Sequence, residues 1–194
     1  MSVIVNVLPA TKTVSDPLTY EDYKTFPDND GIRKEIIEGE LFMSPAPSKK
    51  HQRILRKLIR KLDEYVTDND LGEIFIAPFD VIFSDINVVQ PDLIFLSKKK
   101  YEILTDSNIQ GAPDLLIEIL SPSNKENDRI FKKQIYEIFA VKEYWIVDPD
   151  TETVEIRELK NKKFQLTIKA NKNQIIETQL LKGLRINLFE IFSD

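Results

Sequence analysis

The sequence predicts an α/β or α+β domain in which a mixed β-sheet is flanked by helices on both sides. In the first half of the chain, a long amphipathic helical pattern separates β-like segments. In the second half, a strand, a helix and a second strand follow one another, which is typical of a right-handed crossover between parallel strands. With 194 residues, 42% of them hydrophobic and 30% charged, the chain has the size and composition of one globular domain.

The chain is expected to begin with an arm, a short helix and a hairpin. We interpret residues 1–17 as a flexible arm and residues 18–194 as a single domain. The arm has only a short apolar run without a basic flank, which predicts neither a signal peptide nor a membrane span. Thr19 is a candidate N-cap for a helix that ends before Pro27. The sequence RKEIIEGELFMS then predicts two strands joined at the turn signal Glu38-Gly39.

A long helix is expected after Ser48, its candidate N-cap. Its apolar residues recur at helical spacing and are Ile54, Leu55, Leu58, Ile59, Leu62, Tyr65 and Val66. The remaining face carries seven cations, which are Lys49, Lys50, Arg53, Arg56, Lys57, Arg60 and Lys61. Such a face can be a solvated outer surface, or it can contact the phosphates of a nucleic acid. The sequence leaves both interpretations open.

Strands are expected through the middle of the chain. Residues 72–97 predict two β segments joined near residues 84–87, with Pro78 marking an edge or a bulge. Residues 115–120 are apolar apart from Glu118, as in a central strand that is covered on both faces.

The last third of the chain is expected to complete the crossover and close the domain. A helical stripe in DRIFKKQIYEIFAVK precedes a buried strand in EYWIVDPD. A hairpin is expected around Asn161-Lys162, and the alternating apolar residues of LKGLRINLFEIF close the domain.

The composition limits where the protein works and what it can bind. The chain has no cysteine, so it forms neither disulfides nor thiolate metal sites, and a cytoplasmic location is expected. Any metal must be bound by oxygen atoms or by the single histidine, His51. The net charge of -5 argues against wholesale nucleic-acid binding, but it does not exclude a local basic patch.

Three acidic residues lie in or beside apolar strands: Asp80, Asp92 and Glu118. Asp80, and Asp114 just before the strand of Glu118, are interpreted as acids at strand ends. Glu118 has no turn near it, and burying an ionised carboxylate is costly unless it is paired, hydrogen-bonded or bound to a metal. If Asp92 and Glu118 lie on adjacent strands, their carboxylates can share a divalent cation.

The helix after Glu118 offers a candidate partner for it. Asp128, Lys132 and Tyr136 follow one another at intervals of four residues, so they are expected along one helix face. One interpretation is a plain surface ion pair beside a half-buried tyrosine. The other is that Lys132 reaches the two carboxylates, orients a water and stabilises charge in the transition state. His51 can be a structural residue at the start of its helix or a residue of the same site.

Five ordered motifs carry a resemblance to a known family. They are RKEIIEGELFMSPAPSKKHQRI, QPDLIFLS, GAPDLLIEILSPSN, DRIFKKQIYE and VKEYWIVDP. With them the chain resembles a large bacterial family of restriction-endonuclease-like proteins of unknown physiological role, in the PD-(D/E)XK nuclease superfamily, over residues 18–192. The resemblance implies a restriction-endonuclease-like core of helix, three-stranded meander, helix and strand. It also implies hydrolysis of DNA phosphodiesters that depends on Mg²⁺ or Mn²⁺.

The resemblance also implies a set of site residues. Asp92 matches the motif's aspartate and Glu118 its second acid, and both would bind the metal. The superfamily's lysine two residues later is replaced here by Leu120. The family instead carries a lysine in the following helix, where this sequence has Lys132, and the adjacent Lys133 is a second candidate.

Two further site residues follow from the same resemblance. Glu35 matches a glutamate that supports the metal site in such nucleases. His51 matches the family's histidine at the start of the first core helix.

The sequence therefore predicts a metal-dependent DNA endonuclease with Asp92 and Glu118 on the metal and Lys132 on the attacking water. A nuclease-like fold without catalysis, used to bind DNA or protein, is the alternative, and a purely structural ion-pair or metal site is a third interpretation. The expected partners are DNA and a second copy of the chain, since cutting both strands usually needs two active sites. No association with a membrane is expected.

Overall fold

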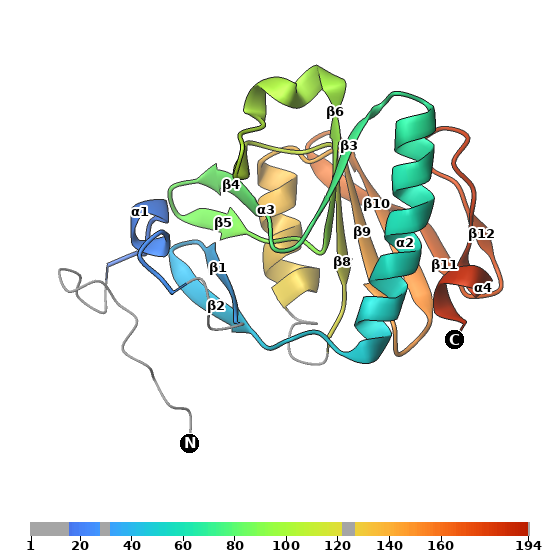
Figure 1. Cartoon of the computed structure of the whole chain (residues 1–194), viewed down its shortest axis with the longest axis horizontal. Helices are drawn as coiled ribbons and strands as arrows, with labels where there is room; N and C mark the ends of the chain where they lie inside the picture. The colour runs from blue at the N-terminus through green and yellow to red at the C-terminus, as the bar shows by residue number, and fades with distance from the viewer. Residues whose placement is uncertain (1–15, 28–31, 122–126, 194) are drawn as a thin grey trace.

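The computed structural model describes residues 16–27, 32–121 and 127–193, with only the backbone described at 127–129. Residues 1–15, which form most of the expected arm, lie outside the described residues. The described residues form a mixed α+β fold with two main sheets, as Figure 1 shows. The fold class predicted from the sequence is confirmed. No helix in the described parts of the chain is long and apolar enough to cross a bilayer.

The larger sheet has six strands in the order β11-β10-β9-β8-β6-β3. Its strands are β3 (Gly72–Ile76), β6 (Leu93–Ser97), β8 (Leu115–Ile119), β9 (Glu143–Asp148), β10 (Thr153–Lys160) and β11 (Lys163–Asn171). Strands β8 and β9 run parallel, as the predicted crossover requires, and the other pairs are antiparallel. Every residue of β8 and β9 is buried, so the prediction of a central strand covered on both faces is confirmed.

The smaller sheet has five strands in the order β2-β1-β5-β4-β7. Its strands are β1 (Arg33–Ile37), β2 (Glu40–Ser44), β4 (Asp80–Ser84), β5 (Asn87–Val89) and β7 (Asn108–Gln110). Strands β1 and β2 form the predicted hairpin, and its turn residues Glu38 and Gly39 both have positive φ angles. A third pair, β12 (Ile175–Ile176) and β13 (Ile186–Asn187), lies near the C-terminus.

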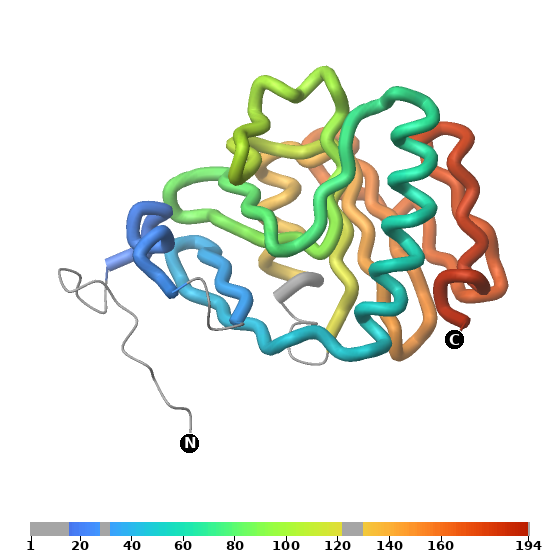
Figure 2. Tube along the Cα trace, viewed as in Figure 1, coloured from blue at the N-terminus to red at the C-terminus, as the bar shows by residue number. Residues whose placement is uncertain are grey.

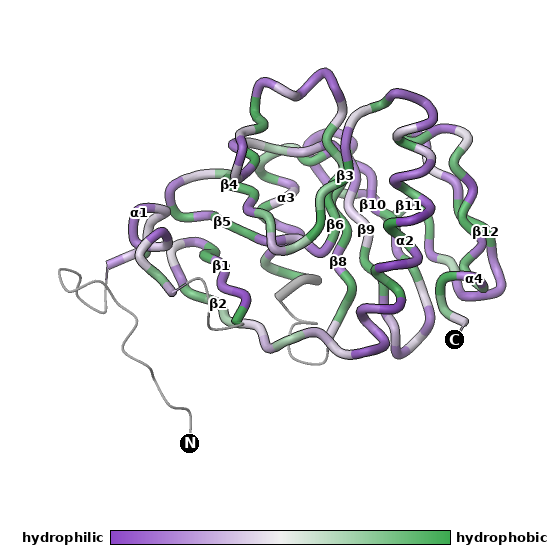
Figure 3. Tube along the Cα trace, in the orientation of Figure 1, coloured by the Kyte–Doolittle hydropathy of each residue, from purple (hydrophilic) through white to green (hydrophobic). Residues whose placement is uncertain are grey.

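The described helices cover the large sheet from opposite faces. Helix α2 (Lys49–Asp68) packs its apolar stripe on one face, beside the short C-terminal helix α4 (Leu188–Phe192). Helix α3 (Lys133–Ile138) packs on the other face together with residues of the small sheet. Figure 3 shows hydrophobic residues along β6 and β8, whereas the outer turns of α2 are hydrophilic. Two further helical segments are α1 (Tyr20–Tyr23) and the 3-10 segment η1 (Lys98–Ile103).

Two predicted helix starts are confirmed by hydrogen bonds. The side chain of Ser48 accepts a hydrogen bond from the backbone N–H of His51, which caps α2. Thr19 and Asp22 form a capping box at the start of α1. The cap at Ser48 matters for the site because it fixes the first turn of α2. Figure 2 shows that this turn lies beside the end of β8.

Two sequence predictions need correction. The segment 72–97 holds four strands rather than two, because the chain leaves the large sheet at Ala77-Pro78, forms the β4–β5 hairpin in the small sheet and returns as β6. The helix predicted from residue 128 begins as a π-helical segment, η2 (Asn127–Lys132), before it continues as α3. The side chain of Asp128, which was expected on the face of Lys132, lies outside the described residues.

Candidate active site

The register of β6 and β8 places the two predicted metal ligands across from each other. Leu93 of β6 pairs with Ile117 of β8 in antiparallel register, so Asp92 and Glu118 are the next facing pair. Side chains alternate along a strand, and Glu118 points to the same face of the sheet as Leu116, toward α3. Both carboxylates are buried, each with about 1% of its residue surface exposed.

Asp92 accepts three hydrogen bonds. The guanidinium of Arg33 donates to Oδ1 at 2.8 Å, and the backbone N–H of Ile119 donates to Oδ2 at 2.8 Å. His51 Nε2 lies 3.0 Å from the same Oδ2. Burial alone would raise the pKa of Asp92, but the hydrogen bond from His51, the charge of Arg33 and the Ile119 N–H lower it to about 2. Asp92 is therefore an ionised, acceptor-only carboxylate at neutral pH.

The charge of Asp92 determines which nitrogen of the His51 ring carries the hydrogen between the two side chains. Because an ionised carboxylate only accepts hydrogen bonds, Nε2 carries the hydrogen that it shares with Asp92. The other ring nitrogen, Nδ1, is buried and has no hydrogen-bond partner. His51 thus orients Asp92 from the first turn of α2 and keeps one polar atom unused.

Lys132 joins Glu118 to a third acid, Glu35. Its Nζ lies 3.0 Å from Glu118 Oε1 and 2.8 Å from Glu35 Oε1, and its side chain is only 2% exposed. Tyr136, one turn later, donates its hydroxyl to Glu118 Oε1 at 2.7 Å. Burial and the charge of Glu118 raise the pKa of Tyr136 well above its ordinary value, so it stays a hydrogen-bond donor. Glu35 also accepts the backbone N–H of Gln90 at 2.7 Å.

All five predicted site residues thus meet in one buried cluster, which we call the charged cluster. It consists of Glu35, His51, Asp92, Glu118 and Lys132 together with Arg33 and Tyr136. Arg33 and His51 contact Asp92, Lys132 and Tyr136 contact Glu118, and the charge of Arg33 also acts on Glu35 and Glu118. The structure also distinguishes the two candidate lysines, because Lys132 is buried in the cluster and Lys133 is partly exposed.

The other two acids of the sequence analysis lie at strand ends, as predicted. Asp114 precedes β8 and pairs with Lys142 at 2.6 Å, while it accepts the backbone N–H of Ser97. Asp80 begins β4 and accepts hydrogen bonds from Tyr23 and Gln90. Both acids therefore have partners within the protein.

The sequence analysis missed Arg33 as a member of the site. Arg33 lies two residues before Glu35 on β1, so the alternation of side chains places both on one face of that strand. This spacing was the available signal, since Glu35 was already a candidate.

The donor chemistry of the cluster fits a divalent cation such as Mg²⁺. Mg²⁺ prefers oxygen ligands, keeps several waters and is usually bound by one or two carboxylates, which Asp92 and Glu118 supply. Within residues 16–27, 32–121 and 127–193, no group of three histidine, aspartate or glutamate side chains has a metal-binding arrangement. A metal here would therefore be bound by two protein carboxylates, which also pair with Arg33 and Lys132.

Comparisons with known proteins agree with this fold. One solved structure that matches is a crystal structure from Anabaena variabilis, described as a "putative nuclease belonging to DUF820". It shares 21% sequence identity with a TM-score of 0.76, over 91% of this chain and 98% of that one. At this identity the likeness shows the fold alone. A comparison with curated protein sequences gave no match.

A family model identifies the chain more directly than the structural likeness does. The Uma2 model, described as "Putative restriction endonuclease", matches residues 20–188, which include the described strands of the two main sheets and the whole charged cluster. The chain belongs to the Uma2 family.

Proposed function

We propose that this protein is a metal-dependent endonuclease that hydrolyses DNA phosphodiester bonds. The observation that carries the proposal is the charged cluster, in which Asp92 and Glu118 face each other across β6 and β8 while Lys132 contacts Glu118. Membership of a family described as "Putative restriction endonuclease", and the likeness to a solved structure described as a "putative nuclease", support the same reaction class.

Asp92 and Glu118 would hold Mg²⁺ or Mn²⁺, which supplies Lewis-acid activation of water and of the phosphate. The chain's own contribution is orientation. His51 and the Ile119 N–H fix the Asp92 carboxylate. Tyr136 fixes Glu118 in the same way.

Lys132 would orient the attacking water and stabilise the charge that develops on the phosphate. Position 120 lies on the same side of β8 as Glu118, so a lysine there would approach from the strand itself. In this chain Leu120 is buried in the apolar core, and the ammonium comes from the end of η2 instead. Its contact with Glu35 holds it in place between two acids.

Helix α2 offers a surface for the DNA backbone. Six of the seven cations of this helix form two groups. Lys57 contacts the backbone carbonyl of Ser193, and Lys61 pairs with Glu190, so these two connect α2 to the C-terminal segment. A second group follows one stripe at intervals of four, three and four residues: Lys49, Arg53, Arg56 and Arg60. This stripe begins next to His51, which would let the backbone of a bound DNA run from α2 into the site.

Cleavage of supercoiled plasmid in Mg²⁺ or Mn²⁺ tests the proposal. We expect wild-type protein to nick or linearise the plasmid and Glu118→Gln to lose this activity. Glu143→Gln is the matched control, because Glu143 is an equally buried glutamate on the adjacent strand β9 and lies outside the charged cluster. Activity that persists in Glu118→Gln, or that is lost equally in Glu143→Gln, would contradict the assignment.

One observation favours a second function, a nuclease-like module that binds DNA or protein without cleaving. Asp92 and Glu118 already have cationic partners in Arg33 and Lys132, so each of the two carboxylates is paired without a metal. DNA binding without hydrolysis in Mg²⁺, Mn²⁺ or Co²⁺ would establish this alternative.

We also propose that the protein acts as a homodimer, because cutting both strands of a duplex usually requires two active sites. Sedimentation velocity of the free protein and of its DNA complex measures this. A monomer in both samples would contradict the proposal.

A further inference from the structure

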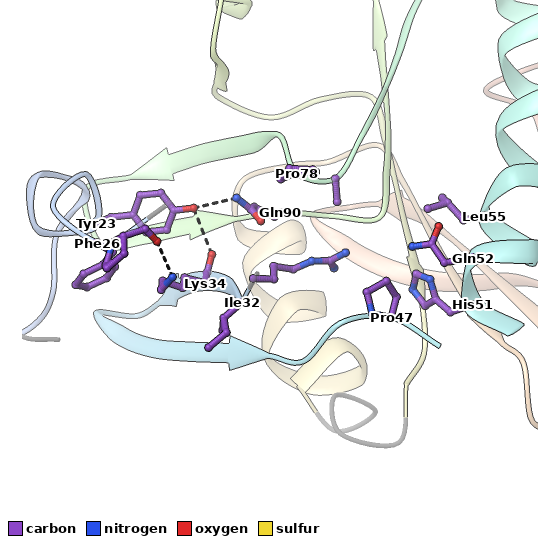
Figure 4. Close-up of a pocket in the computed structure, with 13 residues that line it drawn as sticks. Tyr23, Phe26, Ile32, Lys34, Pro47, His51, Gln52, Leu55, Pro78 and Gln90 are labelled. Carbon is purple, nitrogen blue, oxygen red and sulfur yellow. Dashed lines mark hydrogen bonds between the residues drawn. The ribbon is translucent and has the colours of Figure 1, made fainter. Parts of the chain in front are cut away.

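A pocket of about 520 Å³ adjoins the charged cluster. Its volume lies in the range of roughly 300–1,000 Å³ that is typical of sites for small molecules. The residues that matter for its chemistry are Tyr23, Phe26, Ile32, Arg33, His51 and Gln52. Figure 4 shows Tyr23 and Phe26 at one end of the pocket and His51 and Gln52 at the other.

The pocket shares a wall with the candidate active site. Arg33 and His51 both line the pocket, and both contact the carboxylate of Asp92. A ligand in the pocket therefore lies one side chain away from a proposed metal ligand. The arginine side chain lines the pocket and is 20% exposed, although its guanidinium is anchored on Asp92.

The far end of the pocket is aromatic and fixed in position. The rings of Tyr23 and Phe26 lie 6.1 Å apart at an angle of 68°. The Tyr23 hydroxyl donates to Asp80 at 2.9 Å and accepts from the Gln90 side chain at 3.0 Å, which holds the ring in place. Fixed aromatic rings beside an apolar wall are a surface on which a planar base can pack.

The near end carries a cation suited to a phosphate, and beside it a polar acceptor. Arg33 is a cation with several donors, which suits phosphate oxygens. His51 Nδ1 is buried without a hydrogen-bond partner, and because Nε2 carries the ring hydrogen, Nδ1 can accept a hydrogen bond from a water or from a donor group of the ligand. The two ends thus differ in chemistry in the same way as the two ends of a nucleotide.

We propose that this pocket binds one unpaired nucleotide of the DNA substrate, with its base at Tyr23 and Phe26 and its phosphate at Arg33. A base inside a duplex is stacked and paired, so it can enter a pocket only after it leaves the helix. The substrate class is therefore DNA with an unpaired nucleotide next to the scissile phosphate. The inference rests on the proposed function, which it deepens.

The test compares binding of two fluorescent DNA duplexes of the same sequence, one fully paired and one with a single bulged nucleotide. Binding is measured by anisotropy in EDTA, so that cleavage does not enter the measurement. We expect wild-type protein to bind the bulged duplex at least about fivefold more tightly, as the gain from stacking one base implies. Equal affinity for the two duplexes would overturn the proposal.

A variant that fills the pocket has a matched control in this chain. Ile32→Trp places a large ring at the pocket from a residue that is 44% exposed, whereas Ile175→Trp changes an isoleucine of β12 that is 53% exposed and does not line the pocket. Ile32→Trp should abolish the preference for the bulge, and Ile175→Trp should retain it. If Ile32→Trp fails to fold, Gln52→Trp fills the opposite end from an exposed position on α2.

The two proposals can fail separately. A bulge preference that Ile32→Trp removes, in a protein that cleaves no DNA, supports the pocket and refutes the nuclease. Cleavage of fully paired DNA by a protein without any bulge preference refutes the pocket and leaves the nuclease. A preference that survives in Ile32→Trp also refutes the pocket.

Discussion

Replacing Lys132 with methionine tests the charged cluster as a physical unit. The substitution keeps an unbranched side chain of similar length but removes the ammonium that lies 2.8 Å from Glu35 and 3.0 Å from Glu118. The lysine side chain is 2% exposed, and those of the two glutamates are 3% and 2% exposed, so water cannot replace the lost partner. Breaking a buried ion pair by removing one partner costs about 3–5 kcal/mol.

Protonation of a carboxylate limits this cost. Converting a glutamate of ordinary pKa, about 4.3, to its neutral form at pH 7 costs about 3.7 kcal/mol. We therefore expect Lys132→Met to lower the free energy of unfolding by about 4 kcal/mol at pH 7. The loss should shrink as the pH falls toward 5, because the proton then replaces the ammonium more cheaply.

Urea unfolding of wild type and variant between pH 5 and 8 measures this loss. Lys133→Met is the matched control, since Lys133 is adjacent and only partly buried, and it should cost less than about 1 kcal/mol. Adding Glu35→Gln and Glu118→Gln to Lys132→Met should restore most of the stability. A loss below 1 kcal/mol for Lys132→Met at pH 7, or a loss that is the same at pH 5, would refute the reasoning.

Three further predictions concern pH and salt. The pKa of Asp92 is lowered to about 2 in the folded chain, so its contribution to stability is present above about pH 4 and is lost as the pH falls through 2. In wild type, urea unfolding at a series of pH values should show the free energy of unfolding fall by about 2 kcal/mol over this range, and Asp92→Asn should not show this fall. The same fall in wild type and variant would contradict the prediction. Burial raises the pKa of Glu143 to about 7. The folded protein therefore becomes less stable, through this group, as the pH rises from 4.5 through 7. Glu143→Gln should therefore be more stable than wild type at pH 8, by no more than about 3 kcal/mol, and a gain that does not fade toward pH 4.5 would argue against this cause. Arg56→Ala and Arg60→Ala should each reduce the slope of log affinity for duplex DNA against log salt concentration by about 1, and unchanged slopes in both variants would remove α2 from the DNA surface.

Local signals in the sequence predicted much of the fold. Ser48 caps α2, Glu38-Gly39 turns the first hairpin, and residues 115–119 form the buried central strand, because each of these features depends on residues close together in the chain. The split of residues 72–97 between two sheets was not predictable in this way. It depends on pairing with distant strands, such as β3 with β6 and β4 with β7.

The candidate site shows the same division. The spacing of motifs pointed to Asp92, Glu118 and Lys132, but it could not distinguish Lys132 from Lys133, because the choice depends on how η2 and α3 meet the sheet. The ion pair between Arg33 and Asp92 joins residues 59 positions apart, so only tertiary structure reveals it. The pocket has the same origin, since α1, β1, α2 and the segment before β4 all contribute to its wall.

A crystal structure of the protein grown with Mn²⁺ tests the metal site most directly, because the anomalous scattering of manganese locates the ion independently of activity. We expect an anomalous peak in contact with the carboxylates of both Asp92 and Glu118, and its loss in crystals of Glu118→Gln. The proposed site would be contradicted by crystals at saturating Mn²⁺ that show no peak at this position and keep Arg33 paired to Asp92 and Lys132 to Glu118, if the same protein preparation cleaves plasmid.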